Sequence, residues 1–166
     1  DYMSVLGGTG LTAYFGLLEV GRPKVGETVV ISGAAGATGS TAVQISRAIG
    51  CRTIAIAGGA DKCRWTVETL GADAAIDYQS DDIARRLHAL CPDGVDVYFD
   101  NVGGTTLEAC IGCMKLRGRI ALCGMISTYN DATPTPGPAS AMPRFRVASP
   151  PTAWTTTATT TTRSCR

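Results

Sequence analysis

The chain has 166 residues and a mass of 17.2 kDa, with 45% hydrophobic residues, 17% charged residues and a mean hydropathy of +0.12. This composition predicts one core-forming domain and excludes a wholly disordered chain, and no apolar run reaches the roughly 20 residues that a membrane span needs. Residues 132–166 hold four arginines and no acidic residue, so the remaining residues 1–131 carry −3 of the formal net charge of +1. We therefore expect a soluble protein that binds neither a membrane nor nucleic acid.

The predicted elements follow an alternating order. The first is a helix over residues 11–20, which ends at Gly21, Arg22 and Pro23. Beyond it, short apolar runs alternate with segments whose apolar residues recur every three or four positions, as in βαβ units. Strands are predicted at 28–32, 53–57, 74–76, 95–99 and 119–123, and helices at about 38–49, 61–70, 81–90 and 104–114, with Gly50 and Gly71 as helix stops. Continuously apolar strands indicate a doubly wound parallel α/β sheet of about five strands, covered on both faces.

The composition changes near residue 131. Six of the eight prolines and a run of threonines follow that point, without helical or alternating apolar periodicity. This pattern predicts a disordered or irregular, low-complexity C-terminal tail over residues 131–166. The chain is therefore divided into a helix within residues 1–22, an α/β domain over residues 23–130 and the tail.

Seven cysteines are spread along the chain, and no basic and apolar leader precedes them. This distribution favours reduced thiols and a cytoplasmic protein over a disulfide framework. Cys110 and Cys113 form the one close pair, and His88 is the one histidine, so the ligands for a zinc site are missing. We expect no bound metal and interpret these cysteines as buried or helical thiols.

A glycine-rich turn follows the first predicted strand and opens the next helix. It consists of residues 33–39, Gly-Ala-Ala-Gly-Ala-Thr-Gly. Small residues at this place let the backbone approach a pyrophosphate, which the helix N-terminus then stabilises. The alternative is a tight turn with close packing alone. The surrounding βαβ pattern favours nucleotide binding and a Rossmann fold.

The end of the second predicted strand bears on the choice of cofactor. NAD sites usually place an acidic residue there, whereas this chain has Gly58 and Gly59. Asp61 comes slightly later, where we expect it to cap the next helix. Lys62 and Arg64 can meet a 2′-phosphate, so NADP is favoured over NAD. The alternative is that Lys62 is a solvated charge on the helix surface.

Polar groups also follow the third, fourth and fifth strands, whose carboxyl ends meet at one edge of the sheet. Tyr78 follows the third strand, Asn101 the fourth, and residues 123–129 the fifth. Tyr78 is equally compatible with a surface aromatic. Asp100 and Asn101 are equally compatible with a turn held by local side-chain hydrogen bonds.

Four separated motifs together resemble the zinc-independent medium-chain dehydrogenase/reductases, in particular their branch of prostaglandin reductases and alkenal double-bond reductases. The resemblance extends from about residue 5 to residue 138. The motifs are Thr-Gly-Leu-Thr-Ala-Tyr-Phe at 9–15, the glycine turn at 33–39, Tyr-Phe-Asp-Asn-Val-Gly-Gly at 98–104 and Cys-Gly-Met-Ile-Ser-Thr-Tyr-Asn at 123–130.

The resemblance implies an NADPH-dependent oxidoreductase that reduces the carbon–carbon double bond of α,β-unsaturated aldehydes or ketones, and an intact protein that is a homodimer. It implies that Tyr129 is catalytic, its hydroxyl stabilising the enolate of a small-molecule substrate. The implied NADP(H)-binding residues are Gly36, Ala37, Thr38 and Gly39 at the pyrophosphate, Lys62 and Tyr78 near the 2′-phosphate, Asn101, and Cys123, Gly124, Met125, Ile126, Ser127, Thr128 and Tyr129 beside the nicotinamide.

The chain also departs from that family's pattern. A GroES-like catalytic domain does not precede the first helix, and residues 139–166 match none of the family's final strand and helix. We therefore expect a fragment, with either a shifted reading frame near residue 139 or a natural tail. An unpaired fifth strand is expected to promote aggregation or disorder. The alternative functions are a non-catalytic NADP-binding module, a redox sensor that uses Cys123, and an inactive fragment.

Overall fold

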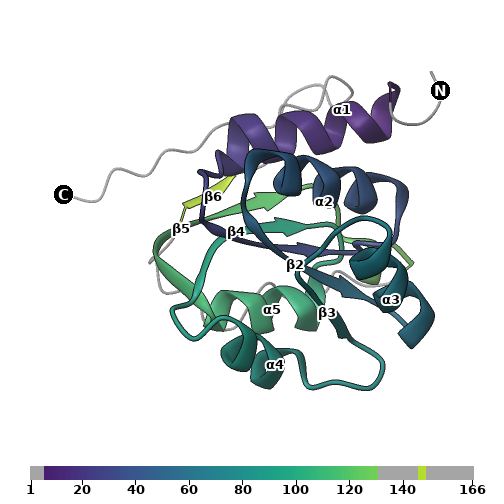
Figure 1. The fold of residues 1–166 in the computed structure, drawn as a ribbon, viewed down its shortest axis with the longest axis vertical. Coiled ribbons are helices and arrows are strands. Elements are labelled where there is room, and N and C mark those ends of the chain that lie inside the picture. The colour runs from purple at the N-terminus through teal and green to yellow at the C-terminus, as the bar shows by residue number, and fades with distance from the viewer. Residues whose placement is uncertain (1–5, 131–145, 149–166) are drawn as a thin grey trace.

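A computed structural model describes residues 6–130 and 146–148 of the chain (Figure 1). Helices and strands alternate almost throughout, as the sequence predicts. The helical elements are α1 (Gly8–Phe15), the π-helical η1 (Gly16–Gly21), α2 (Ala37–Ile49), α3 (Ala60–Glu68), α4 (Ile83–Leu90), α5 (Gly104–Gly112) and the 3₁₀ turn η2 (Ile126–Thr128). The strands are β1 (Thr28–Ser32), β2 (Arg52–Ala57), β3 (Ala74–Asp77), β4 (Val95–Asp100), β5 (Met114–Leu122) and β6 (Arg146–Ala148).

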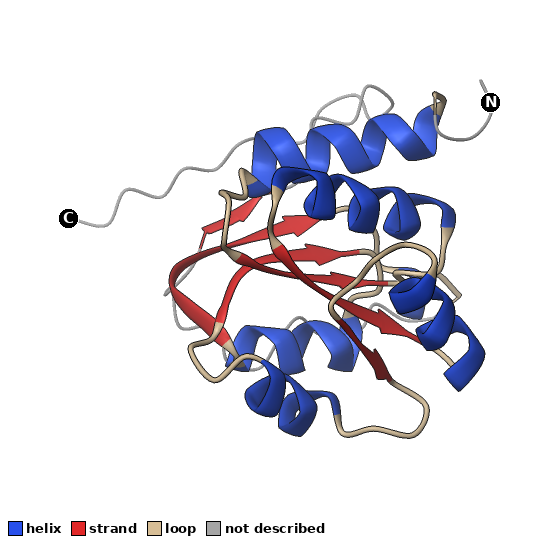
Figure 2. Ribbon diagram, in the orientation of Figure 1, coloured by secondary structure: helices blue, strands red, loops and turns tan. Residues whose placement is uncertain are grey.

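The strands form one parallel sheet in the order β3-β2-β1-β4-β5-β6. In Figure 2, α1 and α2 lie over one face of the sheet, and α4 and α5 lie over the other. The strand order reverses between β1 and β4, and in doubly wound sheets such a reversal opens a crevice at the carboxyl ends of the strands. The predicted doubly wound α/β class is confirmed.

Alternate residues of the central strands supply two separate cores. Val29 and Ile31 of β1 pack toward α1 and α2, whereas Val30 packs toward α4 and α5 with Ile54 and Tyr98. All five side chains are fully buried. Because both faces of these strands are covered, most of their residues are apolar at consecutive positions, which is the pattern that identifies the strands in the sequence.

Strand β5 is longer than the sequence predicts. It begins at Met114, whereas the apolar run begins only at residue 119. Its pairing with β4 shifts register between Val95 and Val97, and Arg117 has a positive φ of 66°. This irregular first half exposes charged side chains and has no apolar run, which is why its extended conformation is not visible in the sequence.

A short sixth strand, β6, lies within the segment for which the sequence predicts no regular structure. It pairs with β5 in parallel, with Ile120 opposite Val147. The expectation of irregular structure is wrong for these three residues, and so is the expectation of an unpaired fifth strand along this stretch. An open strand edge can accept any extended segment through backbone hydrogen bonds, and three residues are too few for a sequence pattern. The rest of residues 131–166 lies outside the described residues.

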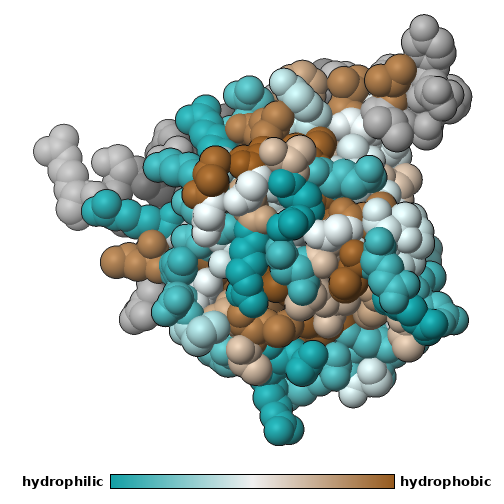
Figure 3. Space-filling model, viewed as in Figure 1, coloured by the Kyte–Doolittle hydropathy of each residue, from teal (hydrophilic) through white to brown (hydrophobic). Residues whose placement is uncertain are grey.

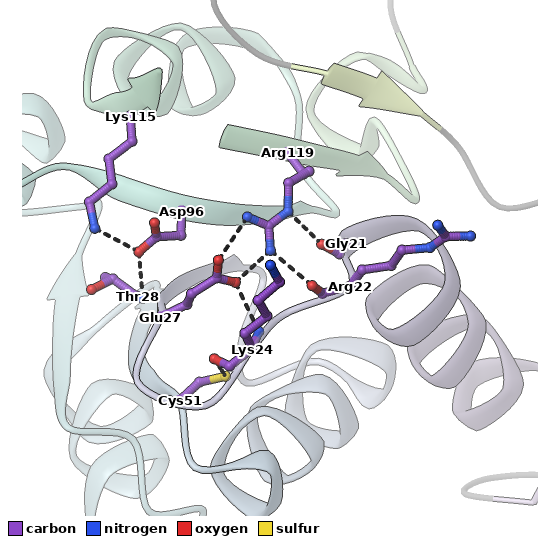
Figure 4. A network of polar contacts seen from close by, with 9 residues as sticks. All are labelled: Gly21, Arg22, Lys24, Glu27, Thr28, Cys51, Asp96, Lys115 and Arg119. Atoms are coloured by element: carbon purple, nitrogen blue, oxygen red, sulfur yellow. Dashed lines mark hydrogen bonds and ion pairs between the residues drawn. The ribbon is translucent and has the colours of Figure 1, made fainter. Parts of the chain in front are cut away.

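A polar network joins the segment before β1 to strand β5 (Figure 4). The Arg119 guanidinium donates to both carboxylate oxygens of Glu27 and to the carbonyl oxygens of Gly21 and Arg22 at 2.9 Å each. The Lys24 amide donates to the same carboxylate at 2.9 Å. Both partners of the ion pair are about 20% exposed. The network therefore ties the end of η1 to the sheet.

Glu27 gives this network a pH dependence. Burial raises the pKa of Glu27, but hydrogen bonds from Arg119 and the Lys24 amide outweigh burial, so the net pKa lies below its ordinary value of 4.5. A depressed folded-state pKa contributes stability that is complete above the unfolded value and is lost as pH falls through the folded value. We expect Glu27→Gln to lower the free energy of unfolding at pH 7 by about 1–2 kcal/mol. Urea unfolding should show a smaller difference near pH 3, and an equal loss at both pH values would contradict this role.

Apolar side chains gather over α1 on the surface seen in Figure 3. Of the residues of α1, Leu11 and Phe15 are about half exposed. Polar side chains predominate over α3 and α4 in the same view. Within residues 6–130 and 146–148, none of the helices combines the length and the apolar character that crossing a bilayer requires.

Candidate functional site

A cavity of about 420 Å³ opens at the carboxyl edge of the sheet, beside the ends of β1, β2, β4 and β5. Most of the residues assigned to cofactor binding in the sequence line this one cavity, although they are separated by up to 93 positions along the chain. Those residues are Gly36, Ala37, Thr38, Gly39, Lys62, Tyr78, Asn101, Cys123, Gly124, Ile126 and Tyr129. The fold therefore brings together groups that the sequence could place only on the same edge.

The glycine turn forms one wall of the cavity. Gly33 has a positive φ of 59°, and the Gly36 amide donates to the Gly33 carbonyl at 2.9 Å, which closes the turn. Gly36 is the N-cap of α2 and no side chain caps that helix end. An added Cβ on Gly39 would lie 2.2 Å from the Gly33 carbonyl oxygen, so helix and turn are in backbone contact. The N-terminus of α2 can therefore present its amides to an anion in the cavity.

A buried carboxylate connects this wall to the turn after β4. Oδ1 of Asp100 accepts hydrogen bonds from Ser32 Oγ at 3.0 Å and from Tyr98 OH at 2.7 Å. The same oxygen accepts the amides of Val102 and Gly103 at 3.0 Å each. Asp100 is fully buried. It is therefore the centre of the hydrogen-bond network that shapes the turn, and the expected local side-chain hydrogen bonds are present.

Asn101 lies at the junction of the same two strands. Its side-chain amide donates to the Ser32 carbonyl at 2.7 Å, and its backbone amide donates to Ser32 Oγ at 3.0 Å. The side chain thus uses one of its two N–H donors on β1 while it lines the cavity. Its second N–H and its carbonyl oxygen are the groups that it can offer to a ligand.

The segments that follow β2 and β3 form a second wall of the cavity. An added Cβ on Gly58 would lie 2.8 Å from the ring and hydroxyl of Tyr78, so this side chain packs directly against the glycine backbone. Tyr78 is 52% exposed, and it lines the cavity together with Lys62. Lys62 is the one cation among the described residues that line this cavity.

Two expectations about the start of α3 need correction. Asp61 does not cap the helix, because Gly59 is the N-cap and Asp61 lies in the first turn. Arg64 pairs with Asp61 at 2.6 Å and does not line the cavity. The pair arises because residues three apart share one face of a helix. Of the two predicted phosphate-binding cations, the structure therefore places only Lys62 at the cavity.

The segment after β5 crosses the turn after β4. The amides of Cys123 and Gly124 donate to the Asp100 carbonyl at 2.8 and 3.1 Å. Tyr129 is 67% exposed, and its hydroxyl oxygen accepts the Met125 amide at 3.3 Å. The hydroxyl proton remains available to a hydrogen-bond acceptor outside the chain.

Three residues of this segment do not line the cavity. Ser127 Oγ donates to the Val102 carbonyl at 2.6 Å, and Thr128 Oγ1 donates to the Met125 carbonyl at 3.1 Å. Met125 packs against Gly103, where an added Cβ would lie 3.3 Å from its side chain. The resemblance implies that Met125, Ser127 and Thr128 lie beside the nicotinamide, but the structure does not place them in the cavity lining, and their contacts instead hold the segment in shape.

The cavity has further lining residues that were not assigned to it from the sequence: Thr12, Gly33, Ala35, Ala57, Gly58 and Val102. Gly33 and Ala35 belong to the glycine turn. In the sequence, Gly58 indicates only that an acidic residue is missing at the end of the second predicted strand. Thr12 comes from α1, and its Oγ1 donates to the Gly8 carbonyl at 2.7 Å. In the sequence, only the motif at residues 9–15 points to a role for Thr12 at the site. The apolar periodicity of a helix does not show which of its residues will lie beside the end of a strand.

Cys123 is a poor nucleophile in this site. Burial, and next the negative charge of Asp100, raise the pKa of its thiol to about 12. Since only the thiolate reacts, about one molecule in ten thousand is reactive at pH 8. We expect Cys123 to resist iodoacetamide in the folded chain and to be modified in urea, as followed by peptide mass spectrometry. Fast modification of Cys123 without urea would contradict this environment.

The close pair Cys110 and Cys113 is buried in the core between the sheet and helices α4 and α5. Cys110 is fully buried and Cys113 is 4% exposed. Burial raises the pKa of both thiols. In the part of the chain that the structure describes, no three His, Cys, Asp or Glu side chains are arranged to hold a metal ion.

Comparison with known proteins identifies similar chains. The NADPH-dependent curcumin reductase of Escherichia coli (strain K12) is 46% identical over 136 residues, which cover 82% of this chain and 39% of the reductase. The putative NADP-dependent oxidoreductase YfmJ of Bacillus subtilis (strain 168) is 55% identical over 130 residues, covering 78% of this chain and 38% of that protein. Mouse (Mus musculus) prostaglandin reductase 1 is 47% identical over 139 residues, covering 82% and 42%.

Solved structures are similar to this chain as well. CurA from Vibrio vulnificus in complex with NADPH matches with a TM-score of 0.82 at 41% sequence identity, covering 89% of this chain and 46% of that one. This chain thus spans about two fifths of the length of the curated relatives it matches. The family model described as "Zinc-binding dehydrogenase" matches residues 37–148, which is more than half of the chain. The chain therefore belongs to this family, the medium-chain dehydrogenase/reductases.

Proposed function

We propose that the chain is the cofactor-binding portion of an NADPH-dependent oxidoreductase that reduces the carbon–carbon double bond of α,β-unsaturated aldehydes or ketones. The observation that carries the proposal is the single cavity in which the glycine turn, Lys62 with Tyr78, Asn101 and four residues of the segment after β5 meet, namely Cys123, Gly124, Ile126 and Tyr129. The names of the similar proteins, which include an NADPH-dependent curcumin reductase and an NADP(+)-dependent 2-alkenal reductase of Nicotiana tabacum, support it.

The cavity suits an extended dinucleotide whose charged groups face the glycine turn and the wall that contains Lys62 and Tyr78. The uncapped N-terminus of α2, lined by Gly36 through Gly39, fits the pyrophosphate. Lys62 and the Tyr78 hydroxyl, at the tips of β2 and β3, fit a 2′-phosphate on the adenosine ribose. The side-chain oxygen of Asn101 and the segment that includes Cys123 and Gly124 then face the nicotinamide half.

Tyr129 is the proposed catalytic group. When bound, NADPH supplies a hydride to the β-carbon of the substrate, and the negative charge that develops on the carbonyl oxygen needs a hydrogen-bond donor. The Tyr129 hydroxyl can donate there because the Met125 amide already satisfies its oxygen at 3.3 Å.

Tyr129→Phe tests this role. In a full-length relative that carries the matching tyrosine, we expect kcat for enone reduction to fall roughly tenfold, below the 10²–10³ of a buried oxyanion donor, because water can partly replace an exposed hydroxyl. The Kd for NADPH should not change. An unaltered kcat would exclude a catalytic role for this tyrosine.

The cofactor assignment is tested by titrating the 166-residue chain with NADPH and with NADH, followed by nicotinamide fluorescence. We expect saturable binding with a clear preference for NADPH. Lys62→Ala should weaken NADPH binding about tenfold through loss of one charged contact and leave NADH binding nearly unchanged. Arg64→Ala is the matched control, because Arg64 lies on the same helix and pairs with Asp61 outside the cavity. Equal affinity for NADPH and NADH would contradict the proposal.

The alternative of a redox sensor that uses Cys123 is less favoured, because its raised pKa leaves almost no thiolate. The same property suits an enzyme whose substrates are thiol-reactive enones. We further propose a cytoplasmic protein, since the six cysteines among the described residues are free thiols, and a homodimer in the intact protein. Light scattering of a full-length protein would test the dimer.

A further inference from the structure

Asp77 ends strand β3, beside the proposed 2′-phosphate wall, and lies outside the lining of the cavity. One of its carboxylate oxygens, Oδ1, accepts the amide of Gly59 at 2.8 Å and the amide of Gln79 at 3.0 Å. Each of these amides immediately follows a lining residue, Gly58 in the first case and Tyr78 in the second. A single oxygen atom thus connects the two chain segments that build this wall.

The two segments also touch each other directly. The Tyr78 ring and hydroxyl lie where a Cβ on Gly58 would come within 2.8 Å, and the Tyr78 amide donates to the Ala57 carbonyl at 3.1 Å. Tyr78 is half exposed and belongs to neither of the two buried cores. Its position therefore depends on the backbone on either side of it, which the Asp77 carboxylate holds.

The negative charge of Asp77 opposes the binding of a phosphorylated ligand, and the effect of the hydrogen bonds that Asp77 accepts has to outweigh this repulsion. The hydrogen bonds from Gly59 and then Gln79 lower the pKa of Asp77 below its ordinary value of 3.8, so the side chain is an anion at neutral pH. An anion near a phosphate site opposes a phosphorylated ligand, and Lys62 is the one cation among the described residues that line the cavity. We therefore attribute the presence of a carboxylate at this position to its role as a hydrogen-bond acceptor.

We propose that Asp77 is a positioning residue that gives the cavity its preference for a dinucleotide with a 2′-phosphate, by holding Gly58 and Tyr78 at a set spacing. This inference rests on the proposed function, since it concerns the same cofactor site. Asp77 acts through the two backbone amides and does not itself contact the ligand.

The experiment measures the ratio of the Kd for NADH to the Kd for NADPH in the 166-residue chain and in three variants. Asp77→Ala removes the acceptor and should lower the ratio about tenfold. Asp77→Asn keeps an acceptor oxygen and removes the charge, so the ratio should equal or exceed that of the wild type. Asp73→Ala is the control, because Asp73 precedes the same strand and accepts the Thr53 amide at 2.7 Å away from the cavity. Its ratio should stay at the wild-type value.

The outcomes separate the inference from the function on which it rests. If the wild type prefers NADPH and Asp77→Ala keeps that preference, the positioning role is overturned and the function stands. If the wild type binds both dinucleotides equally, both are overturned. A general loss of stability would lower both affinities together and leave the ratio unchanged, which also counts against the proposal. Hydrogen exchange provides a ligand-free check, since the Gly59 and Gln79 amides should exchange faster in Asp77→Ala than in Asp77→Asn, and equal rates would overturn the proposed geometry.

Discussion

Gly39→Ala is expected to abolish dinucleotide binding, with a Kd for NADPH at least about a hundredfold higher than that of the wild type, because the helix N-terminus no longer meets the turn. The added Cβ would lie 2.2 Å from the Gly33 carbonyl oxygen and 2.8 Å from the Ala34 Cα. Both contacts are with backbone atoms, so no side chain can rotate away. Helix α2 must instead move off the glycine turn, and the wall that fits the pyrophosphate opens.

The same substitution is expected to lower the free energy of unfolding by about 3 kcal/mol, the upper range for overpacking a rigid site. Gly112→Ala is the control, because it also changes a helical glycine and its Cβ would meet nothing within 4 Å. That variant should bind NADPH normally and be as stable as the wild type or slightly more stable. Urea unfolding and NADPH titration of both variants measure the two effects, and normal binding by Gly39→Ala would show that α2 does not need to contact the turn.

Asp100→Ala is expected to cause the largest loss of stability, about 3–5 kcal/mol, since several buried donors lose their acceptor at once. These donors are the hydroxyls of Ser32 and Tyr98 and the amides of Val102 and Gly103. Asp100 and Tyr98 are fully buried, so water does not replace the lost bonds without opening the core.

Asp100→Asn separates the acceptor from the charge. The amide keeps one oxygen for these donors, but its nitrogen would occupy the place of Oδ2, which is buried and has no hydrogen-bond partner in the described structure. We expect an intermediate loss of stability, smaller than that of Asp100→Ala. Asp61→Ala, at an exposed ion pair on α3, should unfold like the wild type in the same urea series. A loss below about 1 kcal/mol for Asp100→Ala would contradict the role of Asp100 as the centre of the network.

Much of the fold could be predicted because its strands are buried on both faces. The runs at 28–32 and 53–57 are mostly apolar at consecutive positions and match β1 and β2 to within one residue. The glycine turn could be predicted as well, because close backbone contact demands small residues, and the structure confirms that contact at Gly39. Strand β6 and the first half of β5 could not, since pairing at a sheet edge depends on backbone hydrogen bonds rather than on an apolar pattern.

For the candidate site, the residue types at the carboxyl edge of the sheet follow from the sequence alone: the small residues of the glycine turn, Lys62 and Tyr78, Asn101, and the segment that ends at Tyr129. The positions of these residues at or shortly after the ends of predicted strands are enough to place them there, because the carboxyl ends of all parallel strands lie at one edge of the sheet.

Which of these side chains face the cavity, and what holds them there, depends on the three-dimensional fold. The fold placed Lys62 at the cavity and paired Arg64 with Asp61, and it brought Thr12 from α1 to the same cavity. It also assigned Asp77 and Asp100 their positions as acceptors for amides and hydroxyls from several chain segments. Those hydrogen bonds join residues whose separation along the chain follows no period, so they form only once the strands lie side by side.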